Sequence, residues 1–375
     1  MQTTRRHSFK LIGLALALAG TAAPALADRD NDDGFRSGKV FTSSNGAAGN
    51  ELLVYDSDAA GQLSLVARLA TQGVGSGGGL GNQGAVTLSG DGRFVFVVNA
   101  VSNSVSTFSI HRGGLRLEST IDSGGLRPVS VAEHEGLVYV LNAGGAGNVA
   151  GFHNHYGSLK PVAGSVQPLS AATGTGAAQV GFGEDGDALI VTEKGTNKLT
   201  TYRVRHDGGI GAPLVTASAG ATPFGFAVDR RGNLLVSEAF GGAAGASAMS
   251  SYSFSQRAPS QPVLVSASVG TTQSAACWVV VTPNGRYAYT TNTASNTISQ
   301  YAVQRSGQLS LLQAVAATSG AGPIDAALSP RGRALFVLNA GAQTIGAYGV
   351  ARDGRLTGLG NVGGVPAGAN GLAAN

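Results

Sequence analysis

The sequence has one cysteine, one tryptophan and two methionines among 375 residues, and only 12% of its residues are charged. A single cysteine cannot form an internal disulfide, so a disulfide-stabilised scaffold is excluded. Disordered chains carry more charge and fewer apolar residues than the 43% found here, which excludes that class. The 58 glycines show no three-residue period, which excludes a collagen.

Long apolar runs are also scarce. The run at residues 11–19 is shorter than the about 20 residues that span a bilayer, so we expect no membrane span. Basic residues precede this run and Ala25-Leu26-Ala27 follows it, a pattern typical of a cleaved secretory signal over residues 1–27. We therefore predict an exported protein, periplasmic or extracellular. The general secretory and the twin-arginine routes both stay open, because Phe9 stands one place late for the second.

Clustered positive charge is absent from the sequence as well. The whole chain has 25 basic and 21 acidic residues, and cleavage after residue 27 would remove three basic residues and no acidic one. The remaining charge is nearly balanced, so we expect no basic patch and no nucleic-acid partner. Residues 28–38 are polar and mostly charged, which predicts a flexible leader before the folded domain.

What the sequence does contain is an internal repeat. Gly90-Asp91-Gly92-Arg93 opens a β-branched and aromatic segment that ends at Asn99, and similar segments end at Asn292 and Asn339. Looser copies end at the other anchor positions, which are Asn45, Asn142, Glu193 and Glu238. The anchors are 54, 43, 51, 45, 54 and 47 residues apart. This period with strand-forming residues throughout is typical of β-propeller blades.

Each copy supplies four strand signals. A small-residue strand, a Gly-containing turn, a β-branched strand, a polar loop and two further strands follow one another, as at residues 84–117. The first copy lacks its innermost strand, whereas residues 368–373 form an unpaired one that parallels residues 322–327. We therefore predict an all-β, seven-bladed β-propeller over residues 39–375, one domain whose first blade is closed by the N- and C-terminal segments.

The anchors predict where function lies. Each stands where a second strand ends, at the same end of the propeller as the loops that enter the innermost strands, so we expect the seven side chains to ring one mouth of the channel. Asparagine caps turns, which explains the five amides without a function. Glu193 and Glu238 break this pattern in adjacent blades and are the candidate catalytic residues.

Other side chains are expected at the same mouth. The candidate binding residues are Gln83, Arg127, Asn142, Gln179, Lys194, Trp278 and Asp325. Trp278 either floors a ligand pocket or fills the channel. Cys277 is interpreted as a small buried apolar residue. His153 and His155 lack the further ligands that structural zinc requires, so no metal site is assigned.

The repeat resembles the seven-bladed propeller lactonase family. The pattern Asp91-Gly92-Arg93 to Asn99, followed by Ser102-Asn103-Ser104-Val105-Ser106, carries the resemblance, which covers nearly the whole mature chain. The family includes propeller-type 6-phosphogluconolactonases and carboxymuconate lactonising enzymes, and YVTN-type surface propellers share its repeat without known chemistry. The family's catalytic Glu corresponds to Glu193, whereas its His and Arg positions hold Gln179 and Ala178.

The resemblance implies a lactone hydrolase or cyclase acting on a small molecule. Glu193 or Glu238 would be the base, with Lys194 or Arg127 at the developing oxyanion and Gln179 and Asn142 orienting the carbonyl. Export favours a non-phosphorylated lactone. A non-catalytic propeller that binds a ligand or protein partner stays open, as does Ca²⁺ held by the two glutamates; otherwise we expect no cofactor and a monomer.

Overall fold

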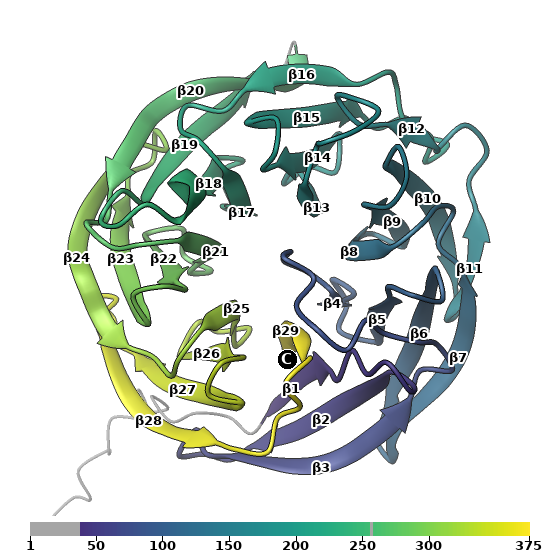
Figure 1. Ribbon diagram of the computed structural model, residues 1–375, viewed down its shortest axis with the longest axis horizontal. Helices are drawn as coiled ribbons and strands as arrows, with labels where there is room; N and C mark the ends of the chain where they lie inside the picture. The colour runs from purple at the N-terminus through teal and green to yellow at the C-terminus, as the bar shows by residue number, and fades with distance from the viewer. Residues whose placement is uncertain (1–37, 256–257) are drawn as a thin grey trace, which may run out of the picture. The chain divides into compact units, whose positions relative to one another are not determined.

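A computed structural model describes residues 38–255 and 258–375, which lie in one compact unit. Their strands make seven antiparallel sheets that follow one another round a ring (Figure 1). The predicted seven-bladed β-propeller is therefore confirmed. The predicted signal, residues 1–27, and all but the last residue of the predicted leader lie outside the described residues. In the described part of the chain no helix has the length and apolarity needed to cross a membrane.

The strands of each blade are given from the innermost outwards. Blade 1 contains β29 (Asn370–Ala374), β1 (Gly38–Ser43), β2 (Glu51–Ser57) and β3 (Leu63–Ala70); blade 2 contains β4 (Val86–Leu88), β5 (Phe94–Asn99), β6 (Ser104–His111) and β7 (Gly114–Asp122). Blade 3 contains β8 (Pro128–His134), β9 (Leu137–Asn142) and β10 (Asn148–His155), with β11 (Ser158–Pro161) and β12 (Gln167–Pro168) both pairing with β10. Blade 4 contains β13 (Ala177–Phe182), β14 (Ala188–Glu193), β15 (Lys198–Arg203) and β16 (Leu214–Ala217).

The last three blades follow the same order. Blade 5 contains β17 (Pro223–Val228), β18 (Leu234–Glu238), β19 (Ala248–Ser255) and β20 (Ala258–Gly270); blade 6 contains β21 (Ala276–Val281), β22 (Tyr287–Asn292), β23 (Thr297–Val303) and β24 (Leu309–Thr318). Blade 7 contains β25 (Pro323–Leu328), β26 (Ala334–Asn339), β27 (Thr344–Val350) and β28 (Leu356–Val362). One short 3₁₀ helix, η1 (Phe240–Gly242), follows β18.

Glycine turns join the first two strands of a blade. In blade 2 the Gly92 N–H donates to the Ser89 carbonyl over 2.8 Å, and Gly92 has φ 69°, a conformation that favours glycine. Gly285 and Gly332 repeat this hydrogen bond and this conformation in blades 6 and 7. The repeated glycine of the sequence is therefore the residue that turns the chain back into the second strand in blades 2, 6 and 7.

The second strands carry the packing between blades. Val95 and Val97 of β5 pack in one apolar cluster with Phe41 of blade 1, whereas Phe96 packs in another with Tyr139 of blade 3. Alternate residues of a strand point to opposite faces, and both faces are covered here by neighbouring blades. The second strands therefore have continuous apolar sequences rather than alternating ones.

The C-terminal strand closes the ring. Strand β29 pairs antiparallel with β1, with Phe41 opposite Ala373. The first and last strands of the described chain therefore lie side by side in blade 1 (Figure 1). The Thr42 hydroxyl donates to the Gly371 carbonyl over 2.6 Å, and the Asn375 N–H donates to the Lys39 carbonyl over 3.0 Å. The predicted closure of blade 1 by both chain ends is confirmed.

The two ends of the propeller differ in what they carry. The loop end holds the connections from second to third strands and from the outermost strand of one blade to the innermost strand of the next. The hairpin end holds the turns between first and second and between third and fourth strands, such as those at Gly92 and at residues 351–355.

Candidate functional site

The seven anchor side chains do not ring the channel mouth. All are buried, with at most 1% of their surface exposed, at or near the ends of the second strands. In blade 2, Asn99 accepts hydrogen bonds from Asn50 and Thr71 and donates to Ser104 and Ser106. The expectation of a ring round the mouth is therefore wrong, because these side chains are buried and bond to strands and loops, as Asn99 does to Asn50 and Thr71 of the preceding blade.

Glu193 serves the same purpose in blade 4. Its carboxylate accepts hydrogen bonds from the backbone N–H and hydroxyl of Ser170, from the Thr196 hydroxyl over 2.8 Å and from the Thr200 hydroxyl over 2.6 Å. All of these groups donate, whereas Asn142 at the same position of blade 3 donates to the Ser123 carbonyl. A carboxylate suits a site that offers only donors, which explains the exchange of Asn for Glu.

Glu238 is enclosed in the same way in blade 5. It accepts hydrogen bonds from the Gly220 N–H over 2.8 Å, from the Ser250 hydroxyl over 2.5 Å and from the Ser268 hydroxyl over 2.7 Å. Burial raises the pKa of this carboxyl, and the three hydrogen bonds oppose that rise. Neither glutamate lines any of the cavities described below, so the geometry gives both a structural role and leaves the catalytic assignment without access to substrate.

Lys194, Phe224 and Trp278 meet at the loop end. The Lys194 ammonium lies 4.4 Å from the centre of the Phe224 ring and donates to the Gly81 carbonyl. The Phe224 and Trp278 rings are 5.1 Å apart, and Cys277 belongs to the same cluster. Trp278 is only 4% exposed, so of its two predicted roles the structure favours filling the mouth.

Electrostatics at this mouth follow from burial. Burial lowers the pKa of Lys194 to about 8, the nearby Cys277 opposes this, and the Arg127 charge adds to it. Burial also raises the pKa of the Cys277 thiol to about 11, in keeping with its interpretation as a small buried residue. Arg127 itself is exposed, and its N–H donates to the Asn103 side chain over 2.7 Å.

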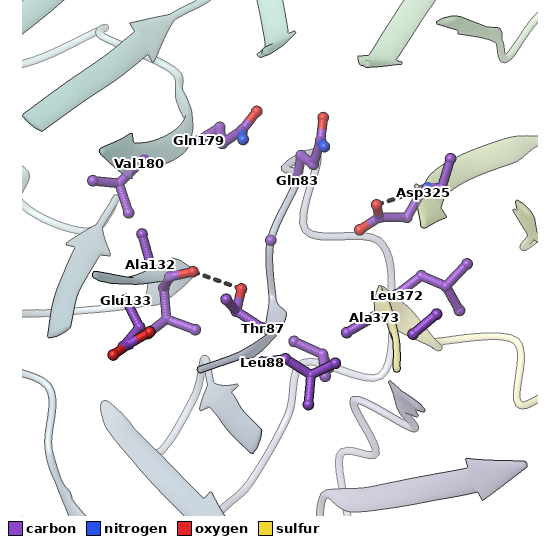
Figure 2. A pocket seen from close by; sticks show the side chains of 16 residues that line it. Gln83, Thr87, Leu88, Ala132, Glu133, Gln179, Val180, Asp325, Leu372 and Ala373 are labelled. Carbon is purple, nitrogen blue, oxygen red and sulfur yellow. Dashed lines mark hydrogen bonds between the residues drawn. The ribbon is translucent and has the colours of Figure 1, made fainter. Parts of the chain in front are cut away.

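Three other predicted residues come together in the axial cavity. The innermost strands enclose about 310 Å³, and Gln83, Gln179 and Asp325 line it with Thr87 and Glu133 (Figure 2). Gln83 precedes β4, Gln179 lies on β13 and Asp325 on β25. The structure thus divides the predicted binding residues between this cavity and the Lys194 mouth, and it buries Asn142 inside blade 3.

The side-chain amides of Gln83 and Gln179 pair with backbone groups as a neighbouring strand would. The Gln179 amide donates to the Phe226 carbonyl over 3.0 Å and accepts from the Phe226 N–H over 2.6 Å. Gln83 pairs with both backbone groups of Val279 over 3.2 Å. An innermost strand has no neighbour on its channel side, so these amides satisfy backbone groups that would otherwise stay unpaired. They close the cavity towards the loop end.

Asp325 is the most deeply buried carboxyl that lines the cavity. It is 2% exposed, its Oδ1 accepts from the Ala326 N–H over 2.8 Å, and its Oδ2 has no hydrogen-bond partner in the described residues. Burial raises the pKa of this carboxyl well above its usual range, although the N–H groups of Ala326, Gly84 and Leu372 pull it down. The sequence predicts Asp325 as a binding residue and not as a base; the available signal is its position in an innermost strand of small residues.

The described residues form no cluster of metal ligands, and they place no basic side chain in the lining of the axial cavity. Across residues 38–255 and 258–375, no three His, Cys, Asp or Glu side chains gather as metal ligands do. The described lining of the axial cavity contains no Lys, Arg or His. The cavity therefore combines the Asp325 carboxyl and Glu133 with walls that carry no cation, which suits proton transfer to or from an uncharged ligand.

Comparison with known proteins agrees with this fold. The family model described as lactonase, 7-bladed beta-propeller matches residues 46–167, 146–239 and 250–369. Among curated proteins no sequence matches this chain.

Solved structures share the architecture at low sequence identity. A provisionally assigned 6-phosphogluconolactonase from Bacteroides uniformis is 18% identical, with a TM-score of 0.72 over 89% of this chain and 99% of its own. The periplasmic gluconolactonase PpgL from Pseudomonas aeruginosa is 18% identical, with a TM-score of 0.69 over 90% and 99%. A protein of unknown function from Desulfotomaculum acetoxidans is 13% identical, with a TM-score of 0.70 over 90% and 99%.

Proposed function

This chain belongs to the seven-bladed β-propeller lactonase family, and from that premise we propose that it hydrolyses a non-phosphorylated lactone in its axial cavity. The observation that carries the proposal is the buried Asp325 carboxyl, which lines this cavity (Figure 2) and whose Oδ2 has no hydrogen-bond partner in the described residues. Asp325 takes the place of Glu193 and Glu238 as the general base, because their carboxylates are enclosed by donors of their own blades.

The reaction follows from one carboxyl and one water. The Asp325 carboxylate removes a proton from water, and the water oxygen forms a bond to the lactone carbonyl carbon. The ring C–O bond then breaks, and the proton passes from Asp325 to the departing ring oxygen, which yields the open hydroxy acid. A raised pKa makes the carboxylate a stronger base near neutral pH than an exposed aspartate would be. The step needs no cofactor.

Charge supports an uncharged substrate. Asp325 and Glu133 line the cavity, and no Lys, Arg or His among the described residues lies there to pair with a phosphate. A buried phosphate without a cation would bear a large desolvation cost. The same two carboxyls repel the carboxylate of the product and favour its release. The volume of about 310 Å³ is at the lower end of the about 300–1,000 Å³ usual for small-molecule sites, which suits a single ring.

Export supports the same choice of substrate. The secretory pattern of residues 1–27 predicts that the mature chain works outside the cytoplasm, which favours a non-phosphorylated lactone. The structural likeness to a periplasmic gluconolactonase is in keeping with this, although at 18% identity it shows the fold alone.

The test compares two lactones and three variants. Hydrolysis of D-glucono-δ-lactone and of its 6-phosphate is followed by pH-stat above the spontaneous rate. We expect turnover of the unphosphorylated lactone, with Asp325→Asn lowering kcat about 10²- to 10⁴-fold, the usual contribution of a general base. Asp353→Asn, at an exposed hairpin, is the matched control and should keep the wild-type rate.

Two results would refute the proposal. The first is an Asp325→Asn variant that turns over at the wild-type rate, which would remove the base. The second is a preference for the phosphorylated lactone, which would contradict a cavity lined by carboxyls and no cation. A Glu193→Gln variant that stays folded should still turn over, which separates the roles of the two carboxyls.

A further inference from the structure

We propose that ligands reach the axial cavity from the hairpin end and not from the loop end, and that Glu133 at this entrance selects against anionic ligands. This assignment rests on the proposed function only for the identity of the ligand, a lactone. The route and the selection by charge follow from how the two ends of the cavity are built.

At the loop end, the segment that leads into β4 lies across the channel. It reaches the centre of the ring (Figure 1). Its Gln83 N–H donates to the Ala178 carbonyl of blade 4 over 3.1 Å, and the Gln83 side chain pairs with the Val279 backbone of blade 6. The Lys194 ammonium of blade 4 donates to the Gly81 carbonyl. The segment is therefore tied to blades 4 and 6 as well as to its own blade.

Packed side chains reinforce this closure. Phe224 and Trp278 are both buried, with their rings 5.1 Å apart. A Cβ added to Gly225 would lie 2.2 Å from Gln83 Oε1 and 2.4 Å from the carbonyl oxygen of Cys277, so there is not even room for a methyl group. The described residues therefore close the cavity at the loop end.

Exposure of the lining rises towards the hairpin end. Gln83 and Asp325 are buried. Leu88, Glu133 and Ala374 line the same cavity at or near the ends of their innermost strands, and they are partly exposed. Each innermost strand runs from the loop end to the hairpin end, so the lining becomes accessible to solvent in that direction. The cavity therefore opens at the hairpin end.

Backbone groups of two blades hold Glu133 at this entrance. Its Oε2 accepts from the Gly90 N–H of blade 2 over 2.7 Å, and its Oε1 accepts from the Gly136 N–H of blade 3 over 2.6 Å. Hydrogen bonds to a charged acceptor are stronger than those between neutral groups. The carboxylate is therefore fixed between the two hairpins, and Figure 2 shows it across the cavity from Asp325.

The lining leaves the charge of Glu133 without a counter-charge. The described lining of the axial cavity contains no Lys, Arg or His. Glu133 also lines an adjoining cavity with His155, where Arg93 pairs with Asp91 over 2.6 Å and Glu135 adds another carboxylate. An approaching anion therefore meets excess negative charge, whereas a neutral ring does not. At about 4 Å one such charge lowers the local concentration of an anion about fivefold even in bulk water.

The test measures access with thiol reagents of opposite charge and needs no turnover. In the mature full chain with Cys277→Ala, which removes the single cysteine, Thr87→Cys places a thiol in the wall of the axial cavity. Mass spectrometry follows its labelling by cationic (trimethylammonium)ethyl and by anionic sulfonatoethyl methanethiosulfonate. Each rate is divided by that of free β-mercaptoethanol. We expect the cationic reagent to label faster, and Glu133→Gln to lower the ratio of the two rates at least about fivefold.

Matched variants separate charge from route. Glu135→Gln is the charge control, because Glu135 lies on the same hairpin but outside the described lining of the axial cavity, and it should leave the ratio unchanged. Leu88→Trp narrows the hairpin-end entrance and should slow both reagents. Phe224→Ala removes a ring from the loop end and should change neither rate.

The route would be overturned by unchanged labelling in Leu88→Trp, by faster labelling in Phe224→Ala, or by no labelling of Thr87→Cys at all. A ratio unaffected by Glu133→Gln, or lowered equally by Glu135→Gln, would overturn the selection by charge. Thermal melts identify any variant that fails to fold, and the ratio measured without Glu133→Gln should itself fall as salt rises; a ratio insensitive to salt contradicts the proposal. Absence of lactone hydrolysis alongside the expected labelling would refute the proposed function alone.

Discussion

The free energy of unfolding should depend less on pH in Asp325→Asn than in the wild type. The size of this effect follows from the burial of the Asp325 carboxyl. The Asp325 carboxyl is 2% exposed and its pKa is raised well above its usual range, mainly by burial. A carboxyl whose pKa is higher in the folded state than in the unfolded state favours folding while it is protonated. Its contribution is complete below the unfolded pKa of about 3.9 and is lost as pH rises through the folded pKa.

The magnitude is about 1.4 kcal/mol for each pH unit between those two pKa values, because one pKa unit corresponds to that free energy. Asn carries no ionisable proton, so the variant does not lose stability in this way as pH rises. Relative to Asp325→Asn, the wild type should therefore become less stable with each unit from pH 4 upwards, until the folded pKa is passed.

The assay is urea unfolding at pH 4, 5, 6 and 7, followed by the fluorescence of Trp278, the single tryptophan and a buried one. Asp353→Asn is the control with the opposite sign. The pKa of Asp353 is lowered by the Arg355 N–H and guanidinium, so this exposed residue favours folding more as pH rises. A free-energy difference between wild type and Asp325→Asn that stays constant from pH 4 to 7 would refute the reasoning.

Further predictions concern the enclosed groups. Glu193→Gln should cost about 1–3 kcal/mol in urea unfolding, because an NH₂ group would face hydroxyl donors; an unchanged midpoint would contradict the enclosure. Trp278→Phe should cost less than about 1.5 kcal/mol by circular dichroism, since the indole N–H has no partner, whereas Trp278→Ala should cost about 3–5 kcal/mol; equal losses would contradict the packing. Deleting residues 370–375 should abolish the wild-type unfolding transition, because blade 1 loses its innermost strand; a native-like transition would contradict ring closure.

The repeat made the fold readable from sequence. Second strands that end at or near an Asn or Glu recur once per blade, and turn glycines such as Gly92 recur in the blades after the first, so strand number and closure followed from the repeat. The seven sheets and the pairing of β29 with β1 confirm both. A local pattern was enough because each blade repeats the same unit of strands.

The direction of the anchor side chains was harder to read. A residue at a strand end can face the channel or its own blade, and the sequence shows the position without the direction. One signal was available: Ser104 and Ser106 follow Asn99 by five and seven places, and Thr200 follows Glu193 by seven. These hydroxyls are the hydrogen-bond partners that hold the anchors inside the blades.

The remaining features depend on contacts between blades. The Gln83 side chain pairs with the backbone of Val279, which is far away in the sequence. No local sequence pattern predicts that pairing. Such features become visible only when the seven blades are assembled.

The most direct measurement is a crystal structure of the mature chain soaked with D-gluconolactam, a ring that resists hydrolysis. The account predicts density for the lactam in the axial cavity, with its carbonyl carbon within reach of a water held by Asp325 Oδ2. Density at the mouth formed by Lys194 and Trp278, with the axial cavity unchanged, would contradict it.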